Sequence, residues 1–359
     1  MPLALTRTYR PNDPVSRPFG IGATHAYNLA LFSENAYLTI SLILPDGGRI
    51  RYQRTSPGTG YIGAVLEHTE TPTRFYKSVL RFVGGAAESW TLTLLDGTVS
   101  TFTYNGDLQS ITDRFGNALT LTREMLPQPA FGGNRPWGKI QRITGPSGRW
   151  IDLTYDAASR IVQAADHLGR VVAYSYDTTG RLAQVVDAAG GGTAYTYDAS
   201  HRLLTIQDAR GIVYLTNQYD ANGRVSQQTQ ADSSTYQWAY TVNGGGAITQ
   251  TDLTNPRGSV RRVTFSPAGY ALTDTQGQGS VLAQPMTYTR QAGTNFILTA
   301  TEALGRQTAF TYATGGNVAS LTRLAGTATA VSTSFTYEAP GAGTFNRLTS
   351  VTTPMATTT

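Results

Sequence analysis

The residues that could do chemistry are scattered along this chain, with one exception, a tyrosine-aspartate pair that recurs. The pair stands at Tyr155-Asp156, Tyr176-Asp177, Tyr197-Asp198 and Tyr219-Asp220, in steps of 21, 21 and 22 residues. A second aspartate follows about half a period later, at Asp166, Asp187 and Asp208. Regular carboxylates suggest calcium binding, and stacked tyrosines suggest a platform for sugar rings. A fixed period of ~20–50 residues is, however, also the signature of a repeat architecture.

Neither calcium nor a transition metal finds a ligand set in this pattern. Calcium takes ~6–8 oxygens that converge on one point, whereas one aspartate per turn supplies too few. The chain has no cysteine, and its histidines have no second ligand at metal-binding spacing; they are His25, His68, His167 and His201. The sequence therefore predicts no metal site and no cofactor, and it favours turn formation as the role of the aspartates.

Catalytic motifs are also missing. The chain has no phosphate-binding glycine loop, no H-E-x-x-H and no G-x-S-x-G elbow. Asp166-His167 is the one Asp-His neighbour pair, and Asp166 opens a D-x-x-G-R stretch that turn chemistry explains. We predict no catalytic residues and no enzymatic activity.

The elements that carry the pairs read as β-hairpins. Residues 171–176 are β-branched and aromatic, as in a strand, and Asp177 and Gly180 then occupy the first and fourth positions preferred in a type I turn. The return strand ends at a second turn that begins at Asp187. One period is thus one hairpin, with Asp177, Asp198 and Asp220 at one edge and the half-period aspartates at the other. At the fourth turn position, His201 tolerates a left-handed backbone better than Ser159 does.

Two copies contain the most complete form of the repeated motif, at residues 174–182 (YSYDTTGRL) and 195–203 (YTYDASHRL). This motif resembles the tyrosine-aspartate (YD) repeat of the RHS family, which is shared with the insecticidal Tc toxin cocoons and the teneurins. Residues 18–29 also resemble the start of RHS shells, although Ala23 stands where that pattern has Trp. The resemblance implies an all-β fold, a repeat array of antiparallel β-hairpins in a continuous spiralling sheet. The repeat-defining residues are Tyr155, Asp156, Tyr176, Asp177, Gly180, Arg181, Tyr197, Asp198, Arg202, Tyr219, Asp220, Gly223 and Arg224.

Tyrosines and arginines recur with the turns and allow two interpretations each. Tyr174 and Tyr176 share one face of their strand, as do Tyr195 and Tyr197; cross-strand packing is favoured over a glycan platform. One arginine follows each turn, at Arg160, Arg181, Arg202 and Arg224. Pairing with a turn aspartate is favoured over a polyanion-binding stripe. Nucleic-acid binding requires clustered basic residues, so a net charge of +5 spread in this way predicts no nucleic-acid partner.

The regularity of the repeat divides the chain into four segments. Residues 1–126 form divergent RHS-like hairpins, and residues 127–136 form a Pro/Gly-rich loop or linker, or else a longer hairpin tip. Residues 137–240 hold the regular YD repeats, and residues 241–359 hold divergent YD-like repeats. No helical periodicity is present, and the most apolar run, residues 37–44, is too short to span a membrane.

The resemblance implies a non-enzymatic structural segment of an RHS shell that encapsulates a polymorphic toxin or effector domain, secreted by a bacterium or at its surface. Family members cleave themselves with a D-P-x-G motif near the shell's end; Asp13-Pro14-Val15-Ser16 departs from it and lies at the opposite end. The alternative is an extracellular interaction or adhesion module that binds glycans or cell surfaces, with possible self-association. Unpaired strands at residues 3–9 and 332–337 predict pairing through sheet edges, with the remainder of the same polypeptide or a second copy.

Overall fold

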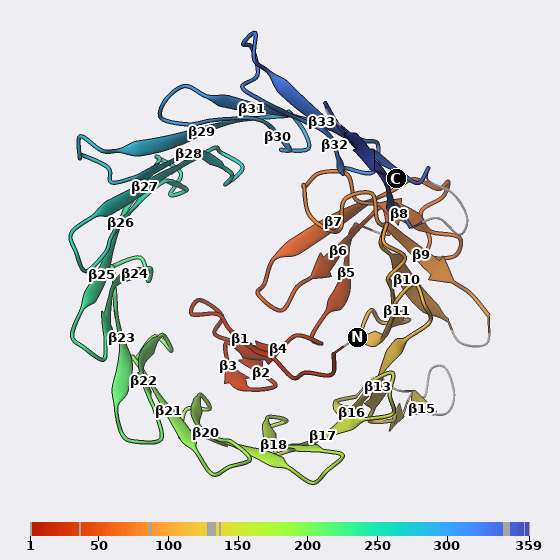
Figure 1. The fold of residues 1–359 in the computed structure, drawn as a ribbon. Helices are drawn as coiled ribbons and strands as arrows, with labels where there is room; N and C mark the ends of the chain where they lie inside the picture. The colour runs from red at the N-terminus through yellow and green to blue at the C-terminus, as the bar shows by residue number, and fades with distance from the viewer. Residues whose placement is uncertain are drawn as a thin grey trace. The chain divides into compact units, whose positions relative to one another are not determined.

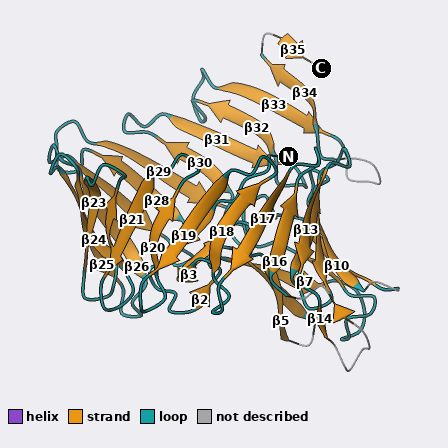
Figure 2. Ribbon diagram, turned by 90° about the horizontal axis from the view of Figure 1, so that it is seen from below, coloured by secondary structure: helices purple, strands orange, loops and turns teal. Residues whose placement is uncertain are grey.

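The protein is built from β-strands. The computed structural model describes residues 2–35, 37–85, 88–127, 134–135, 138–339, 345–354 and 356–358. Within these ranges every regular element is a strand and none is a helix (Figure 2). No helix in the described part of the chain could therefore cross a membrane. The prediction of an all-β fold made of consecutive antiparallel hairpins is confirmed.

The chain forms two compact units. Unit 1 comprises Met1–His68 and Ser78–Tyr214, and unit 2 comprises Thr69–Lys77 and Leu215–Thr359. The division falls inside the strand β23 (Val213–Tyr219) and therefore within the stretch of regular repeats. Each unit is described below by itself.

The sheet of unit 1 follows the order of the chain, and each strand pairs antiparallel with the next (Figure 1). Its strands are β5 (Ala30–Asn35), β6 (Thr39–Ile43), β7 (Arg49–Arg54), β8 (Val65–Glu67), β9 (Val79–Val83), β10 (Ser89–Thr93), β11 (Val99–Thr103), β12 (Leu108–Thr112), β13 (Ala118–Arg123), β16 (Ile140–Thr144), β17 (Trp150–Tyr155), β18 (Ile161–Asp166), β19 (Val171–Tyr176), β20 (Leu182–Val186), β21 (Gly192–Tyr197) and β22 (Leu203–Gln207).

Short ladders accompany this sheet. β1 (Arg7–Tyr9) pairs with β4 (Ala23–His25), and β2 (Ser16–Arg17) pairs with β3 (Gly20–Ile21). β14 (Leu126–Pro127) pairs with β15 (Asn134–Arg135). Within the expected linker 127–136, the described ends therefore form a short hairpin, while residues 128–133 and 136 lie outside the described residues.

Unit 2 continues the same connectivity beyond residue 214. Its strands after β23 are β24 (Val225–Gln230), β25 (Thr235–Val242), β26 (Ile248–Thr254), β27 (Val260–Phe265), β28 (Ala271–Gln276), β29 (Gln284–Arg290), β30 (Ile297–Thr301), β31 (Gln307–Tyr312), β32 (Val318–Arg323), β33 (Val331–Tyr337), β34 (Leu348–Thr353) and β35 (Ala356–Thr358).

Each YD hairpin has a tight turn followed by a β-bulge. In the turn after β19, the Gly180 amide donates to the Asp177 carbonyl (3.0 Å), and Gly180 has a φ of 93°. Ser159 and His201 take the same position with φ of 65°, so the side chains there accept left-handed backbone. The strand register then shifts by one residue between Ser175 and Tyr176, and the equivalent shift precedes the other repeat tyrosines.

The core lies almost wholly in unit 1. Alternate residues of its strands are buried on one face, as a period of two requires. Fully buried examples are Tyr52, Phe102, Leu66, Leu80, Leu92, Leu108, Ile143 and Ile161. Residues 2–29, the N-terminal segment, pack against this face beside β18–β22 (Figure 1). In unit 2, among the described residues, only Phe296 and Asn217 are buried, at 8% and 5% exposed.

Candidate functional site

The turn aspartates hold their own hairpins closed. The Asp177 Oδ1 accepts hydrogen bonds from the backbone amides of Thr179 (3.0 Å) and Arg181 (2.9 Å), and its Oδ2 accepts one from the Arg181 Nε (2.6 Å). Asp198 makes the same three contacts one repeat later, and Asp220 does so in unit 2. A side chain that accepts from the amides two and four residues ahead replaces bonds that the turn itself cannot make.

These bonds favour the ionised carboxylate. Partial burial by itself raises the pKa of the Asp177 carboxyl, but the hydrogen bonds from the Arg181 amide, the Thr179 side chain and the Arg181 guanidinium lower it more. The net pKa therefore lies below its ordinary value of 3.8. Asp156, Asp198 and Asp220 show the same balance, with burial outweighed by hydrogen bonds and by the charge of the following arginine.

The tyrosine of each pair ties its repeat to the one before. The hydroxyl of Tyr176 donates to the Ile161 carbonyl (2.5 Å), and that of Tyr197 donates to the Leu182 carbonyl (2.8 Å). Each acceptor lies 15 residues earlier in the chain, at the first position of the previous return strand. The same bond recurs from Tyr155 to Ile140, from Tyr240 to Val225 and from Tyr312 to Ile297. Burial raises the pKa of the Tyr176 hydroxyl, which keeps it protonated as the donor.

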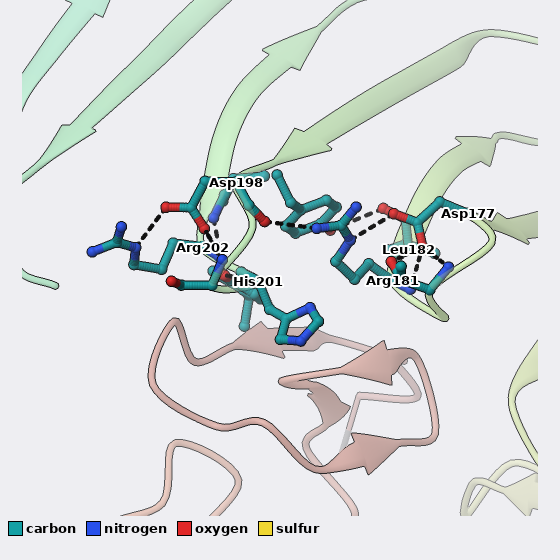
Figure 3. A network of polar contacts seen from close by, with 11 residues as sticks. Asp177, Arg181, Leu182, Asp198, His201 and Arg202 are labelled. Atoms are coloured by element: carbon teal, nitrogen blue, oxygen red, sulfur yellow. Dashed lines mark hydrogen bonds and ion pairs between the residues drawn. The ribbon is translucent and has the colours of Figure 1, made fainter.

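The arginine after each turn is held from two sides (Figure 3). Arg181 is ion-paired with Asp177, donates from Nη1 to the Asp198 carbonyl (2.7 Å), and lies over the Tyr197 ring at 5.2 Å. Arg160 lies over the Tyr176 ring at 4.4 Å in the same way. The guanidinium thus bridges its own turn and the next repeat. It is not presented as a free cation to a polyanion.

The network leaves little chemistry for a ligand or a reaction. The repeat carboxylates accept from backbone amides and arginines, and the repeat tyrosines donate to carbonyls. Across the described residues no cluster of His, Cys, Asp or Glu could hold a metal ion. The half-period aspartates stand at the opposite strand ends, where Asp187 accepts the amides of Ala189 and Gly191. The spacing of the pairs therefore organises hairpins.

The histidines are not brought together. His25 is only 2% exposed, and burial lowers its pKa to about 4, with the nearby Arg123 charge adding to the effect. The His68 Nδ1 lies 2.7 Å from the Arg51 carbonyl. Beside His167, the Asp166 carboxylate is engaged by the Leu168 and Arg170 amides. Asp166-His167 therefore serves the turn.

The N-terminal segment docks on the repeats, which sequence reasoning did not foresee. Arg7 lies 5.6 Å from the Tyr174 ring centre and 5.8 Å from that of Tyr195, so it contacts the rings of two successive hairpins. The Phe19 ring contacts Tyr174 at 4.8 Å between ring centres. The tyrosines here pack mainly against the N-terminal segment. The glycines of the F-G-x-G stretch could have indicated this docking, because a glycine allows the backbone of one segment to lie close to that of another.

Hydrogen bonds to the backbone of the repeats complete this docking and reach three successive hairpins. The Ile161 amide donates to the Pro18 carbonyl (2.7 Å), and the Ile21 amide donates to the Gly180 carbonyl (3.1 Å). The Tyr9 hydroxyl donates to the His201 carbonyl (2.6 Å) and accepts from the Leu203 amide (3.0 Å). These contacts fall on the same positions of the repeat each time.

Comparison with known proteins gives one family match. The family model described as RHS Repeat matches residues 155–191 and 176–213. These are the hairpins that carry the network above. No curated protein matches the chain.

Among solved structures, the chain is similar to several that hold TcdB2 and TccC3. The crystal structure titled TcdB2-TccC3-Cdc42 has 13% identity and a TM-score of 0.48, covering 87% of this chain and 17% of that one. TcdB2-TccC3 without its hypervariable C-terminal region has 12% identity and a TM-score of 0.48, covering 88% and 20%. The Photorhabdus luminescens Tc holotoxin pore, with a mutated TccC3, has 12% identity and a TM-score of 0.40, covering 88% and 19%.

This chain spans about a fifth of the length of the solved chains to which it is similar. Its own match to the family rests on residues 155–213, where the repeated Tyr, Asp and Arg form one bonded network. Over these residues the resemblance to the RHS repeat is confirmed.

Proposed function

We propose that this chain is a non-enzymatic structural segment of an RHS shell that encapsulates a toxin or effector domain, secreted by a bacterium or displayed at its surface. The observation that carries the proposal is the network itself. The repeat-defining acids, cations and hydroxyls bond to their own turn or to the neighbouring repeat. This supports a structural role for them, as parts of the shell wall, rather than a catalytic one. The partners are then the remainder of the same polypeptide or a second copy.

A protease-protection experiment tests this function. The complete gene product that contains this chain is purified and treated with protease, and any domain outside the repeats is followed by mass spectrometry. We expect that domain to survive in the intact protein and to be digested after mild denaturation. Equal digestion in both states, or a gene product without such a domain, would contradict encapsulation.

A variant sharpens the experiment. Tyr176→Phe with Tyr197→Phe removes two bonds between repeats and leaves the rings in place, so it should speed digestion of the enclosed domain. Tyr214→Phe is the matched control, because that residue is 41% exposed. The control should leave protection unchanged.

A second candidate, an extracellular module that binds glycans, is favoured by one feature of unit 2. Hydroxyl pairs cross between strands on one sheet face, at Thr264–Thr273 (2.6 Å), Thr289–Thr299 (2.7 Å), Thr311–Ser320 (2.7 Å) and Thr322–Ser332 (2.7 Å). Uncharged hydroxyls in regular rows can exchange hydrogen bonds with the hydroxyls of a neutral polysaccharide. A glycan array separates the two functions, since a shell wall alone has no reason to retain any sugar.

A further inference from the structure

His25 is a buried base at the end of a short strand. It closes β4, whose three residues are all buried and pair with the three residues of β1. The His25 side chain is 2% exposed, and its Nδ1 has no hydrogen-bond partner among the described residues. A buried polar atom without a partner costs free energy, and a buried charge without a counter-ion costs more. The site of His25 therefore accepts a neutral imidazole far better than an imidazolium.

Aromatic rings surround the imidazole within its own segment. The ring centres of Phe19 and Tyr27 each lie 6.2 Å from that of His25. The Tyr27 hydroxyl donates to the Ala4 carbonyl (2.7 Å), and burial raises the pKa of this hydroxyl. Tyr27 therefore stays neutral and brings no negative charge to His25.

Two arginines face His25 from different elements. Arg7 of β1 is its direct cross-strand partner, so the two side chains lie on the same face of the ladder. Both side chains also meet at Phe19, since the Arg7 Cζ lies 5.9 Å from the centre of that ring. Arg123 of β13 is the second cation, and its charge disfavours a protonated imidazole. A proton on His25 would therefore add a third positive charge.

The acids of this region are engaged elsewhere. Arg123 donates twice to the Leu108 carbonyl, at 3.1 and 3.0 Å. The Asp107 carboxylate partly offsets the burial of Arg123. Burial raises the pKa of the Asp107 carboxyl, so acid weakens this counter-charge. Asp13 is the one acid of the N-terminal segment, and it is ion-paired with two arginines of that segment.

This environment makes docking of the N-terminal segment depend on pH. Burial lowers the pKa of His25 to about 4, and the Arg123 charge adds to the effect. In a segment released from the repeats, the imidazole takes its ordinary pKa of 6.5. The docked state thus binds the proton less readily than the released state. The contribution of His25 to docking is complete above pH 6.5 and is lost as pH falls toward about 4.

We propose that residues 2–29 are a pH-sensitive cover for the hairpins from β18 to β22, with His25 as the sensor. At neutral pH the uncharged imidazole lets the segment stay docked. In acid a proton on His25 favours the open form, which uncovers the rings of Tyr174 and Tyr195 and the amides of Ile161 and Leu203. Such a response needs no enclosed domain, so it goes beyond the proposed function.

Amide hydrogen exchange of the full chain at pH 7 and pH 5 tests the cover. The rates are corrected for the pH dependence of exchange in an unstructured peptide. Opening at the amides of Ile21, Ile161 and Leu203 should then increase about 30-fold at pH 5, as one proton gives between pKa values of 6.5 and about 4. The internal reference is the amide of Leu92, a fully buried residue of β10. The three docking amides should open more readily than Leu92 at both pH values.

Variants assign the response to the imidazole. His25→Phe keeps an aromatic ring that cannot take a proton, so its opening should change by less than about threefold between the two pH values. His25→Gln gives the same test with a smaller polar side chain, should the Phe variant fail to fold. His167→Gln is the matched control, because His167 lies in the turn between β18 and β19, outside the segment. It should keep the full response.

Three results would overturn the proposal. The first is a change of less than about threefold at the docking amides of the unaltered chain. The second is equal opening at these amides and at Leu92, which would mean that unit 1 unfolds as a whole. The third is a full response in the His25 variants, which would assign it to another group. Failure of protease protection for an enclosed domain would bear on encapsulation alone.

Discussion

At the scale of the residue, the first position of the turn requires a side-chain oxygen that accepts hydrogen bonds from backbone amides. The negative charge of aspartate adds a bond to the following arginine. Asp198 accepts the amides of Ser200 and Arg202, each at 2.9 Å. Asn243 accepts the two equivalent amides of its own turn through its Oδ1, both at 3.0 Å. The charge contributes the bond to the Arg202 Nε, which an amide oxygen makes less strongly.

The first prediction separates these two contributions. Asp198→Ala loses all three bonds and should lower the free energy of unfolding by about 1–2 kcal/mol. Asp198→Asn keeps the two amide bonds and should cost less than half of that. Urea denaturation of both variants gives the measurement, and equal costs would mean that the ion pair with Arg202 carries the whole effect.

The second prediction concerns acid. The pKa values of Asp156, Asp177, Asp198 and Asp220 lie below the ordinary 3.8, so the folded state binds these protons less readily than the unfolded state. Their stabilisation is complete above the unfolded value and is lost as pH falls through the folded values. The aspartate contribution to the melting temperature should therefore hold steady down to about pH 5 and be lost below about pH 4. Buried His25, whose pKa is lowered to about 4, should add a separate decrease that begins near pH 6.5, where the unfolded chain takes up this proton. A variant with Asn at all four positions should show a shallower drop, and an equal drop would assign the effect to other groups.

At the scale of the element, docking of the N-terminal segment depends on one glycine. Gly20 has a φ of 88°, and a Cβ there would also meet the Leu182 amide nitrogen at 3.2 Å. Two costs therefore coincide at Gly20, a strained backbone and a collision with the repeat. Gly190 has nearly the same φ, 86°, with no atom within 4 Å of a Cβ, so it carries only the first cost.

The third prediction uses this matched pair. Gly20→Ala should release residues 2–29 from the repeats and make them sensitive to limited proteolysis. Gly190→Ala should cost only about 1 kcal/mol through backbone strain and leave the segment protected. Protection of the segment in both variants would mean that the other contacts suffice to hold it.

The N-terminal segment also shows which structural features could be predicted from the sequence and which could not. Asp177, Gly180 and Arg181 act within five residues, so their spacing alone predicts the turn and its position at one edge. The bond from Tyr9 to His201 joins residues 192 positions apart, and no periodicity encodes it. The contacts of Arg7 with the Tyr174 and Tyr195 rings were unforeseen for the same reason. Hydrogen bonds within a turn can be predicted from the repeated residues, because their partners are close in the sequence. Docking of the N-terminal segment depends on which distant parts of the chain the folded sheet brings together.

At the scale of the whole molecule, the two units differ in how much they bury. Leu66, Leu80 and Phe102 of unit 1 are fully buried, whereas the aromatic residues of unit 2, apart from Phe296, keep part of their surface in solvent wherever the structure describes them. Burial of apolar surface is the main favourable term in folding. Unit 2 should therefore be the less stable of the two.

The fourth prediction is that unfolding occurs in two steps, with unit 2 first. Calorimetry should show two transitions, and hydrogen exchange should assign the earlier one to residues after 215. Leu108→Ala, at a fully buried position of unit 1, should lower the stability of the later step by about 2–5 kcal/mol and leave the earlier one unchanged. A single transition that this substitution shifts as a whole would refute the independence of the units.

The tyrosine bond that reaches back 15 residues has a consequence for how such chains change length over generations. A duplicated hairpin inserted after Gln230 would find the acceptor it needs in the preceding copy and offer the same acceptor to the following one, whereas an insertion of half a hairpin would find neither. Duplications between Tyr155 and Leu203 are different, because Pro18, Ile21 and Tyr9 bind three hairpins at fixed positions. Gain and loss of sequence should thus come in steps of one whole hairpin, and the hairpins under the N-terminal segment should be the last to vary in number.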